Sequence, residues 1–313
     1  MQYNKPPLTY LQQITLMQSR GLTVPDVAKA QKYLCGISYY RLSAYAIPFQ
    51  QVKDTFNNGT TFQDVLNLYL FDKELRLIAF DAIERLEVTI RTQIIYSLSH
   101  KYGSHWQDDR TIFKPAYKIK SGKIIDPWQD IQNTIRDNFL SKYPEVFIKH
   151  YRDNYTKPPT PPSWMAIELL TMGQLSRLYK GLVHNQDKKE IADHFGLHHT
   201  LFESWIHALI YGRNLCAHHS RFWNRDFLIT ADIPRKNPAL PWFSFPMNNN
   251  RRCFYFLSVI KYLLQTTNPS GHYKRKITEL IQKYPNTPIQ FMGIPSDGKG
   301  NLINWQNEPL WQK

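Results

Sequence analysis

Residues 61–102 read TFQDVLNLYLFDKELRLIAFDAIERLEVTIRTQIIYSLSHKY, and this stretch decides the fold. Apolar residues recur along it at helical intervals, with charged residues between them. The apolar positions are Val65, Leu66, Leu75, Ile78, Ile83, Leu86, Ile90 and Ile94. Thr61 and Asp64 have the spacing of a helix N-cap. We therefore predict one very long amphipathic helix over this stretch, with a break near Asp72-Lys73.

Shorter helices are predicted on both sides of the long one, from apolar spacing and from bounding Gly, Pro or Ser residues. Their expected ranges are 8–20, 25–34, 38–45, 127–151 with an interruption at Pro144, a helix capped by Ser163 with Trp164 facing inward, 188–194, 253–264 and 274–284. Residues 103–126 are expected to form a loop or a small hairpin. Residues 230–248, which hold four prolines, are expected to be irregular.

The absence of regular strand alternation over long stretches predicts an all-α fold. We expect an N-terminal helical subdomain over residues 1–56. A helical core over 57–284 would follow, with an inserted loop region near 103–162. The tail over 285–313 is expected to dock on the body through its tryptophans.

Composition indicates a well-packed basic protein. Of 313 residues, 42% are hydrophobic and 14% aromatic, which excludes a disordered chain. Lys and Arg number 39 against 25 Asp and Glu, giving a formal charge of +14. Such an excess favours polyanionic partners, with nucleic acid first and an anionic membrane surface second.

The cysteines and the N-terminus indicate a soluble, cytoplasmic protein. Cys35, Cys216 and Cys253 are widely spaced and suggest neither a disulfide framework nor a metal site. The N-terminus lacks the apolar core of a signal peptide. No apolar run approaches the roughly 18 residues of a membrane span, so no membrane association is expected.

Most of the chemistry lies in residues 211–225, YGRNLCAHHSRFWNR. On a helix, Asn214, His218, Arg221 and Arg225 would share one face, and the long Arg213 side chain could bend onto it. The apolar spacing of the preceding residues predicts such a helix, with a capping box at Thr200–Glu203. Gly212 and Asn214 both weaken a helix interior, and such a break of the rule is more expected at a functional site.

A titratable imidazole among guanidinium groups suits a phosphodiester. The His can move protons at neutral pH, while the arginines offset the phosphate charge. The alternative is a solvated basic helix end without function.

Four segments occur in the order seen in the Abi-like abortive-infection family of bacterial phage-defence proteins, the D/F type. They are ISYYRLSAY at 37–45, DAIERLEVTIRT at 81–92, SWMAIE at 163–168 and GRNLCAHHSRFWNR at 212–225. The closing MGIP at 292–295 and PLW at 309–311 also resemble that family's tail. The resemblance spans nearly the whole chain.

That family is similar to the HEPN superfamily, whose members are helical bundles that often dimerise. Many are metal-independent ribonucleases with an Arg, four to six residues, and then a His. Here four residues separate Arg213 from His218, and Asn214 also matches. The resemblance implies a HEPN-like bundle and an endoribonuclease that needs neither metal nor cofactor.

RNA supplies its own nucleophile, the 2′-OH, so proton transfer and charge stabilisation suffice to cut it. The candidate catalytic residues are Arg213, Asn214 and His218, and the supporting or RNA-binding candidates are His219, Arg221, Arg225, Glu87 and Arg91. In-line attack favours two proton-transfer groups, so we predict a homodimer with a composite active site.

Two other functions stay open. The first is a non-catalytic RNA-binding or regulatory HEPN protein, held by a partner RNA. The second is a protein-interaction adaptor that does not bind RNA.

Several residues also have purely structural interpretations. Glu87 and Arg91 are spaced for an ion pair, and Glu168 for a buried hydrogen-bonding partner. The residues Tyr39, Tyr40, Arg41 and Tyr45 could stack on bases, but aromatic clusters at helical spacing are more typical of a core. Cys216 is expected to be a packing residue. Neither the pair Arg177 and His184 nor the histidines at 194, 198, 199, 218 and 219 favour a second site or zinc.

Overall fold

The computed structural model describes residues 2, 6–118, 121–122, 124–235, 241–247 and 249–312. These residues confirm the all-α prediction, since 61% of them are helical and the strands among them are very short, beside thirteen α-helices and six 3₁₀ helices. No described helix has the length and apolarity needed to cross a membrane.

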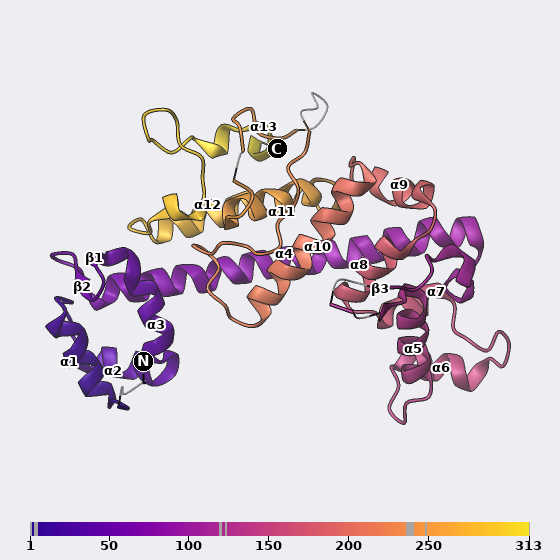
Figure 1. The fold of residues 1–313 in the computed structure, drawn as a ribbon, viewed down its shortest axis with the longest axis horizontal. Helices are drawn as coiled ribbons and strands as arrows, with labels where there is room; N and C mark the ends of the chain where they lie inside the picture. Colours follow the sequence, from indigo (N-terminus) through magenta and orange to yellow (C-terminus); the bar gives the residue numbers. More distant parts are fainter. Residues whose placement is uncertain are drawn as a thin grey trace.

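The long helix α4, Phe62–Tyr102, runs through the whole molecule (Figure 1). Its 41 residues give a length of about 60 Å. The predicted N-terminus is confirmed, because Thr61 and Asp64 form a reciprocal capping box. The predicted break near Asp72-Lys73 is wrong. Asp72 is fully buried and pairs with Arg76 one turn later, so its charge is accommodated inside a continuous helix.

Three helices and a hairpin gather at the N-terminal end of α4 (Figure 1). They are α1 Tyr10–Ser19, α2 Val27–Ile37, α3 Tyr39–Ala46, β1 Gln50–Val52 and β2 Thr55–Phe56. The three helices match the prediction. The antiparallel hairpin was not predicted, because its strands of three and two residues are too short to show alternation. The domain boundary after residue 56 stays a prediction.

A second group of short helices lies near the C-terminal end of α4 (Figure 1). It comprises α5 Pro127–Phe139, α6 Val146–Asn154, α7 Ser163–Ala166, α8 Met172–Gly181 and α9 Asn185–Asp193. The interruption at Pro144 is confirmed. The predicted small hairpin is present as β3 Tyr117–Lys118 and β4 Ile124–Ile125, although residues 119, 120 and 123 lie outside the described part. Trp164 was expected to face inward, but it is half exposed.

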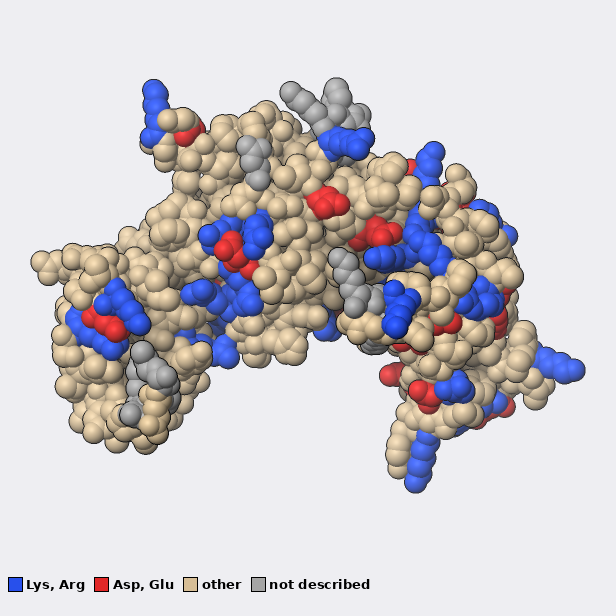
Figure 2. Space-filling model, viewed as in Figure 1, with Lys and Arg blue, Asp and Glu red and all other residues tan. Residues whose placement is uncertain are grey.

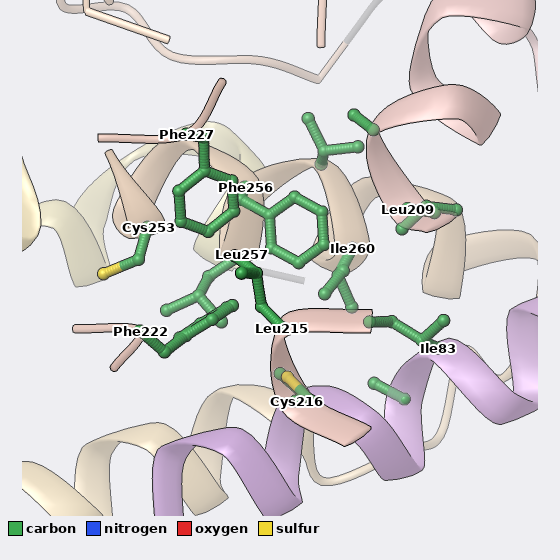
Figure 3. Close-up of a cluster of buried hydrophobic side chains, with 14 of the residues drawn as sticks. Ile83, Leu209, Leu215, Cys216, Phe222, Phe227, Cys253, Phe256, Leu257 and Ile260 are labelled. Atoms are coloured by element: carbon green, nitrogen blue, oxygen red, sulfur yellow. The ribbon is translucent and has the colours of Figure 1, made fainter. Parts of the chain in front are cut away.

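The remaining helices α10 His199–Ala217, α11 Cys253–Thr267 and α12 Tyr273–Lys283 pack along the middle of α4. Figure 3 shows part of the core between them, where Leu209, Leu215 and Cys216 of α10 meet Phe256 and Ile260 of α11 and Ile83 of α4.

This packing explains Gly212 of α10. A Cβ atom at this position would lie 2.1 Å from Cζ of Phe256. The glycine is therefore required by close helix packing, and the functional explanation for it is unnecessary.

The C-terminal segment lies against α11, where the rings of Trp305 and Trp311 contact the ring of Phe254. Trp305 and Trp311, the latter in α13 Pro309–Gln312, are buried with ring centroids 4.7 Å apart. Residues 230–235 and 241–247 carry no helix or strand, which confirms the irregular stretch; residues 236–240 and 248 lie outside the described part. Six short 3₁₀ helices complete the described structure, at 47–49, 106–108, 110–112, 167–169, 289–292 and 305–307.

Candidate nucleic-acid site

Helix α10 carries the Arg-Asn-to-His residues on its last turn. It begins after His198, whose ring caps the helix through the backbone N–H of Thr200. The predicted capping box at Thr200–Glu203 is therefore wrong. Glu203 instead pairs with Lys188, at 3.2 Å, and so is drawn away from the helix N-terminus.

The helix ends at His218, which is the C-cap residue and whose N–H donates to the carbonyl of Asn214 at 3.0 Å. His219 follows with φ of 54°, in the left-handed region, and turns the chain away from the helix axis. Arg221 and Arg225 thus lie beyond the helix. The prediction that they share a helix face with Asn214 and His218 is wrong, because the helix stops too early.

Arg213 and Asn214 lie exposed on the last turn of α10. The Arg213 guanidinium sits over the ring of Phe80 on α4, 5.9 Å from its centroid, and its Nη1 donates to Oδ1 of Asn214 at 3.5 Å. Arg213 therefore covers α4, and His218 is presented separately at the end of the helix.

His218, His219 and Arg221 line a pocket of about 760 Å³. Its other walls come from the C-terminal end of α1, from α3 and from the β1–β2 hairpin. Arg213, Asn214 and Arg225 are not among the lining residues. On the face shown in Figure 2, Lys and Arg side chains gather where α10 ends over α4.

Two arginines tie the pocket walls to each other. Arg41 of α3 donates from Nη1 to the carbonyl of His219 at 2.6 Å. Arg221 donates in the opposite direction, to the carbonyl of Ala44 at 3.1 Å. The Tyr-Tyr-Arg segment of α3 and the segment after α10 are 177 and 178 residues apart along the chain, yet they form one site.

The tyrosines of α3 differ in their surroundings. Tyr45 is buried, which confirms the core interpretation for this residue. Tyr40 lines the pocket and is 89% exposed, so the core interpretation is wrong for it.

One buried carboxylate fastens the segment after α10 to α4. Asp72 accepts hydrogen bonds from the backbone N–H groups of Phe222 at 3.2 Å and Trp223 at 2.8 Å. It also accepts from the Tyr45 hydroxyl at 2.6 Å and from Arg76. Burial raises the pKa of the Asp72 carboxyl, and these four donors act in the opposite direction.

Sequence reasoning missed the structural role of Asp72 and Arg76. Arg76 also donates to the carbonyl of Ser220 at 3.2 Å, so both members of the pair hold the same segment. The available signal was an acid and a base four residues apart inside an apolar run. That spacing indicates an ion pair. It does not indicate that Asp72 also accepts a hydrogen bond from the backbone N–H of Phe222, 150 residues further along the chain.

Cys216 is a packing residue, as expected. Its side chain is buried, and burial raises the pKa of its thiol to about 12. It is therefore protonated at neutral pH and is a poor nucleophile.

Glu87 and Arg91 form the expected ion pair, at 3.1 Å. Arg91 also contacts Glu168 at 3.3 Å and donates to the carbonyl of Leu170 at 2.9 Å. The pair starts about 16 Å further along α4 than Arg76, and neither residue lines the pocket. Glu168 is exposed, so its interpretation as a buried partner is wrong.

The alternative sites have ordinary structural roles. Arg177 pairs with Asp130 at 2.6 Å. In the part of the chain that the structure describes, no group of three or more His, Cys, Asp or Glu residues could hold a metal ion.

The arrangement of the pocket suits an anionic ligand. His218 offers an exposed imidazole in the same pocket as the guanidinium groups of Arg221 and Arg41. The imidazole can accept or donate a proton, and the guanidinium groups can hydrogen-bond to phosphate oxygens.

The comparisons with known proteins give one match. Neither the curated proteins searched nor the solved structures searched contain a match to this chain. A family model described as Abi-like protein matches residues 32–224, which is more than half of the chain. The matched range includes α3, all of α4 and the segment after α10, which together hold the pocket and its Asp72 anchor. The chain therefore belongs to the Abi-like protein family.

Proposed function

We propose that this protein acts in abortive infection, the arrest of phage-infected bacteria, as a metal-independent endoribonuclease of HEPN type. Family membership supports the role in phage defence. The observation that carries the enzymatic part is the exposed His218, which lines a cationic pocket and is separated by four residues from Arg213.

In the proposed reaction, a histidine removes the proton of the ribose 2′-OH, whose oxygen attacks the adjacent phosphorus. The bond from phosphorus to the 5′-oxygen then breaks, and a second proton-transfer group acts as an acid and gives that oxygen a proton. The products carry a 2′,3′-cyclic phosphate and a 5′-OH. Arginines stabilise the charge on the phosphorane.

A homodimer supplies the second proton-transfer group in this proposal. One chain presents a single His218, and its Arg213 packs over Phe80 outside the pocket. Two chains related by a two-fold axis would bring two Arg213/His218 sets to one phosphate. Dimerisation is measurable by analytical ultracentrifugation of the whole chain.

The test is digestion of a single-stranded RNA in EDTA, with analysis of the product ends. The wild-type protein should leave 2′,3′-cyclic phosphates. His218→Ala should cut at least about 100-fold more slowly, because general acid–base assistance is worth about 10²–10⁴-fold. His207→Ala is a matched control, since His207 is an exposed residue of the same helix outside the pocket. Strict dependence on a divalent metal would refute the proposal.

The separation of Arg213 from the pocket also favours a second candidate, an RNA-binding protein without catalysis that is held by a partner RNA. It predicts equal RNA affinity in the wild type and in His218→Ala, with no cleavage by either. An adaptor that does not bind RNA predicts no salt-dependent RNA binding at all.

A further inference from the structure

The pocket beside His218 carries a strong excess of positive charge. Four cationic side chains line it, namely Arg20, Arg41, Lys53 and Arg221. The only lining carboxylate in the part of the chain that the structure describes is Asp54, which pairs with Arg20 at 2.9 Å. Arg41 and Arg221 each bond to a carbonyl, but a guanidinium has five donors and can still bind a phosphate.

The same pocket has an aromatic and apolar side. Tyr39 and Tyr40 line it from α3, and Ile47 and Val52 line it from the segment that follows. The hydroxyl of Tyr39 is fixed by Arg20 at 3.0 Å. Tyr40 is 89% exposed, so its ring is free to be covered by a flat ligand. A ligand that fits both sides is planar and apolar at one end and anionic at the other.

We infer that this pocket binds one unpaired nucleotide of an RNA strand, with the base on the ring of Tyr40 and the flanking backbone phosphates at the cationic lining residues Arg41, Lys53 and Arg221. Stacking on an aromatic ring suits any base and does not require a sequence. The inference rests on the proposed function, because it takes the strand that His218 would cut as the ligand.

The walls of the pocket select a single strand. Its volume of about 760 Å³ lies within the range of small-molecule sites. It is bounded by the C-terminal end of α1, by α3, by the β1–β2 hairpin and by the segment after α10. A base stacked inside a duplex cannot enter such a space, whereas an unstacked base of a single strand can.

The test measures the binding of a fluorescein-labelled 12-mer of 2′-O-methyl-uridine by fluorescence anisotropy. This strand lacks the 2′-OH nucleophile, so it is not cut and affinity is read alone. The variant is Tyr40→Ala with Lys53→Ala, both at exposed positions whose loss leaves the core intact. We expect at least about fivefold weaker binding, and a salt slope reduced by about 0.7 for one lost phosphate contact.

The matched control is Tyr143→Ala with Lys142→Ala, which removes the same two residue types at exposed positions outside the pocket. It should bind the strand as the wild type does. A pocket variant that binds as tightly as this control overturns the inference. The inference is also overturned if the pocket variant loses as much affinity for a blunt 12-base-pair duplex as it loses for the single strand.

Cleavage of the unmodified strand is measured in parallel and separates the two proposals. Loss of strand binding in the pocket variant, without cleavage by the wild type, would support the nucleotide pocket and refute the ribonuclease. Cleavage by the wild type, with unchanged strand binding in the pocket variant, would support the ribonuclease and refute the nucleotide pocket.

Discussion

Two ion pairs with the same spacing lie on α4, and their surroundings differ. Asp72 and Arg76 have side chains that are 0% and 4% exposed. Glu87 and Arg91 have side chains that are 20% and 12% exposed. The first pair forms hydrogen bonds with backbone N–H and carbonyl groups of the segment after α10. In the second pair, Arg91 donates to a backbone carbonyl of the segment before α8.

The difference shows that spacing alone does not tell what an ion pair does. A buried carboxylate without partners costs several kcal/mol, so Asp72 requires all four of its donors. The Glu87 pair is reached by solvent and is weaker in a high dielectric. The buried pair therefore fixes the site, and the other pair only attaches neighbouring segments.

The largest effect is expected from Asp72→Asn. Asn keeps the size of the side chain but leaves the Arg76 charge buried without its partner. The free energy of unfolding should fall by about 3–5 kcal/mol, as for other broken buried pairs. Urea unfolding followed by circular dichroism measures it. A loss below about 1 kcal/mol would show that the two pairs are equivalent.

A smaller effect is expected from Glu87→Gln. Arg91 keeps its contacts with Glu168 and with the carbonyl of Leu170, so no charge is left alone. The free energy of unfolding should fall by about 1 kcal/mol or less, and less still in high salt. The same urea experiment at two ionic strengths tests this. A loss equal to that of Asp72→Asn would remove the distinction.

The smallest effect concerns pH and a third pair on the same helix. Hydrogen bonds from Arg85 and from Lys276 of α12 lower the pKa of Asp81. The folded-state pKa lies below the unfolded value of about 3.9, so this stabilisation is present above that pH and is lost as the pH falls through the folded pKa. The side chain is 45% exposed, so the contribution is below about 1 kcal/mol.

Asp81→Asn should therefore reduce stability slightly at pH 6 and not at pH 2, as measured by urea unfolding. An equal loss at both pH values would mean that the carboxylate charge contributes nothing.

Local signals in the sequence predicted much of the fold. The capping residues Thr61 and Asp64 marked the start of α4, and the apolar spacing gave its length. The short hairpin at residues 50–56 was missed, because two or three residues cannot show a strand period. Trp164 was misplaced, because a large apolar side chain in a short helix does not reveal which side is solvated.

The candidate site was predicted only in part. The residues after α10 were singled out, but the helix was extended too far, because the left-handed turn at His219 has no glycine to announce it. Base stacking by Tyr40 was considered, but the meeting of α3 with the segment after α10 could not be deduced, since Arg41 bonds to a carbonyl 178 residues away. Contacts of that separation depend on tertiary packing and not on local pattern.

Asp72 touches both sides of the pocket without lining it. It holds Tyr45 on the α3 side and the amides of Phe222 and Trp223 on the other. A ligand that enters between these walls does not have to order them, so little of its binding energy is lost as conformational entropy. The hydrogen bonds of the buried Asp72 carboxylate set the distance between the two walls. We therefore expect ligands that need a wider opening to be excluded.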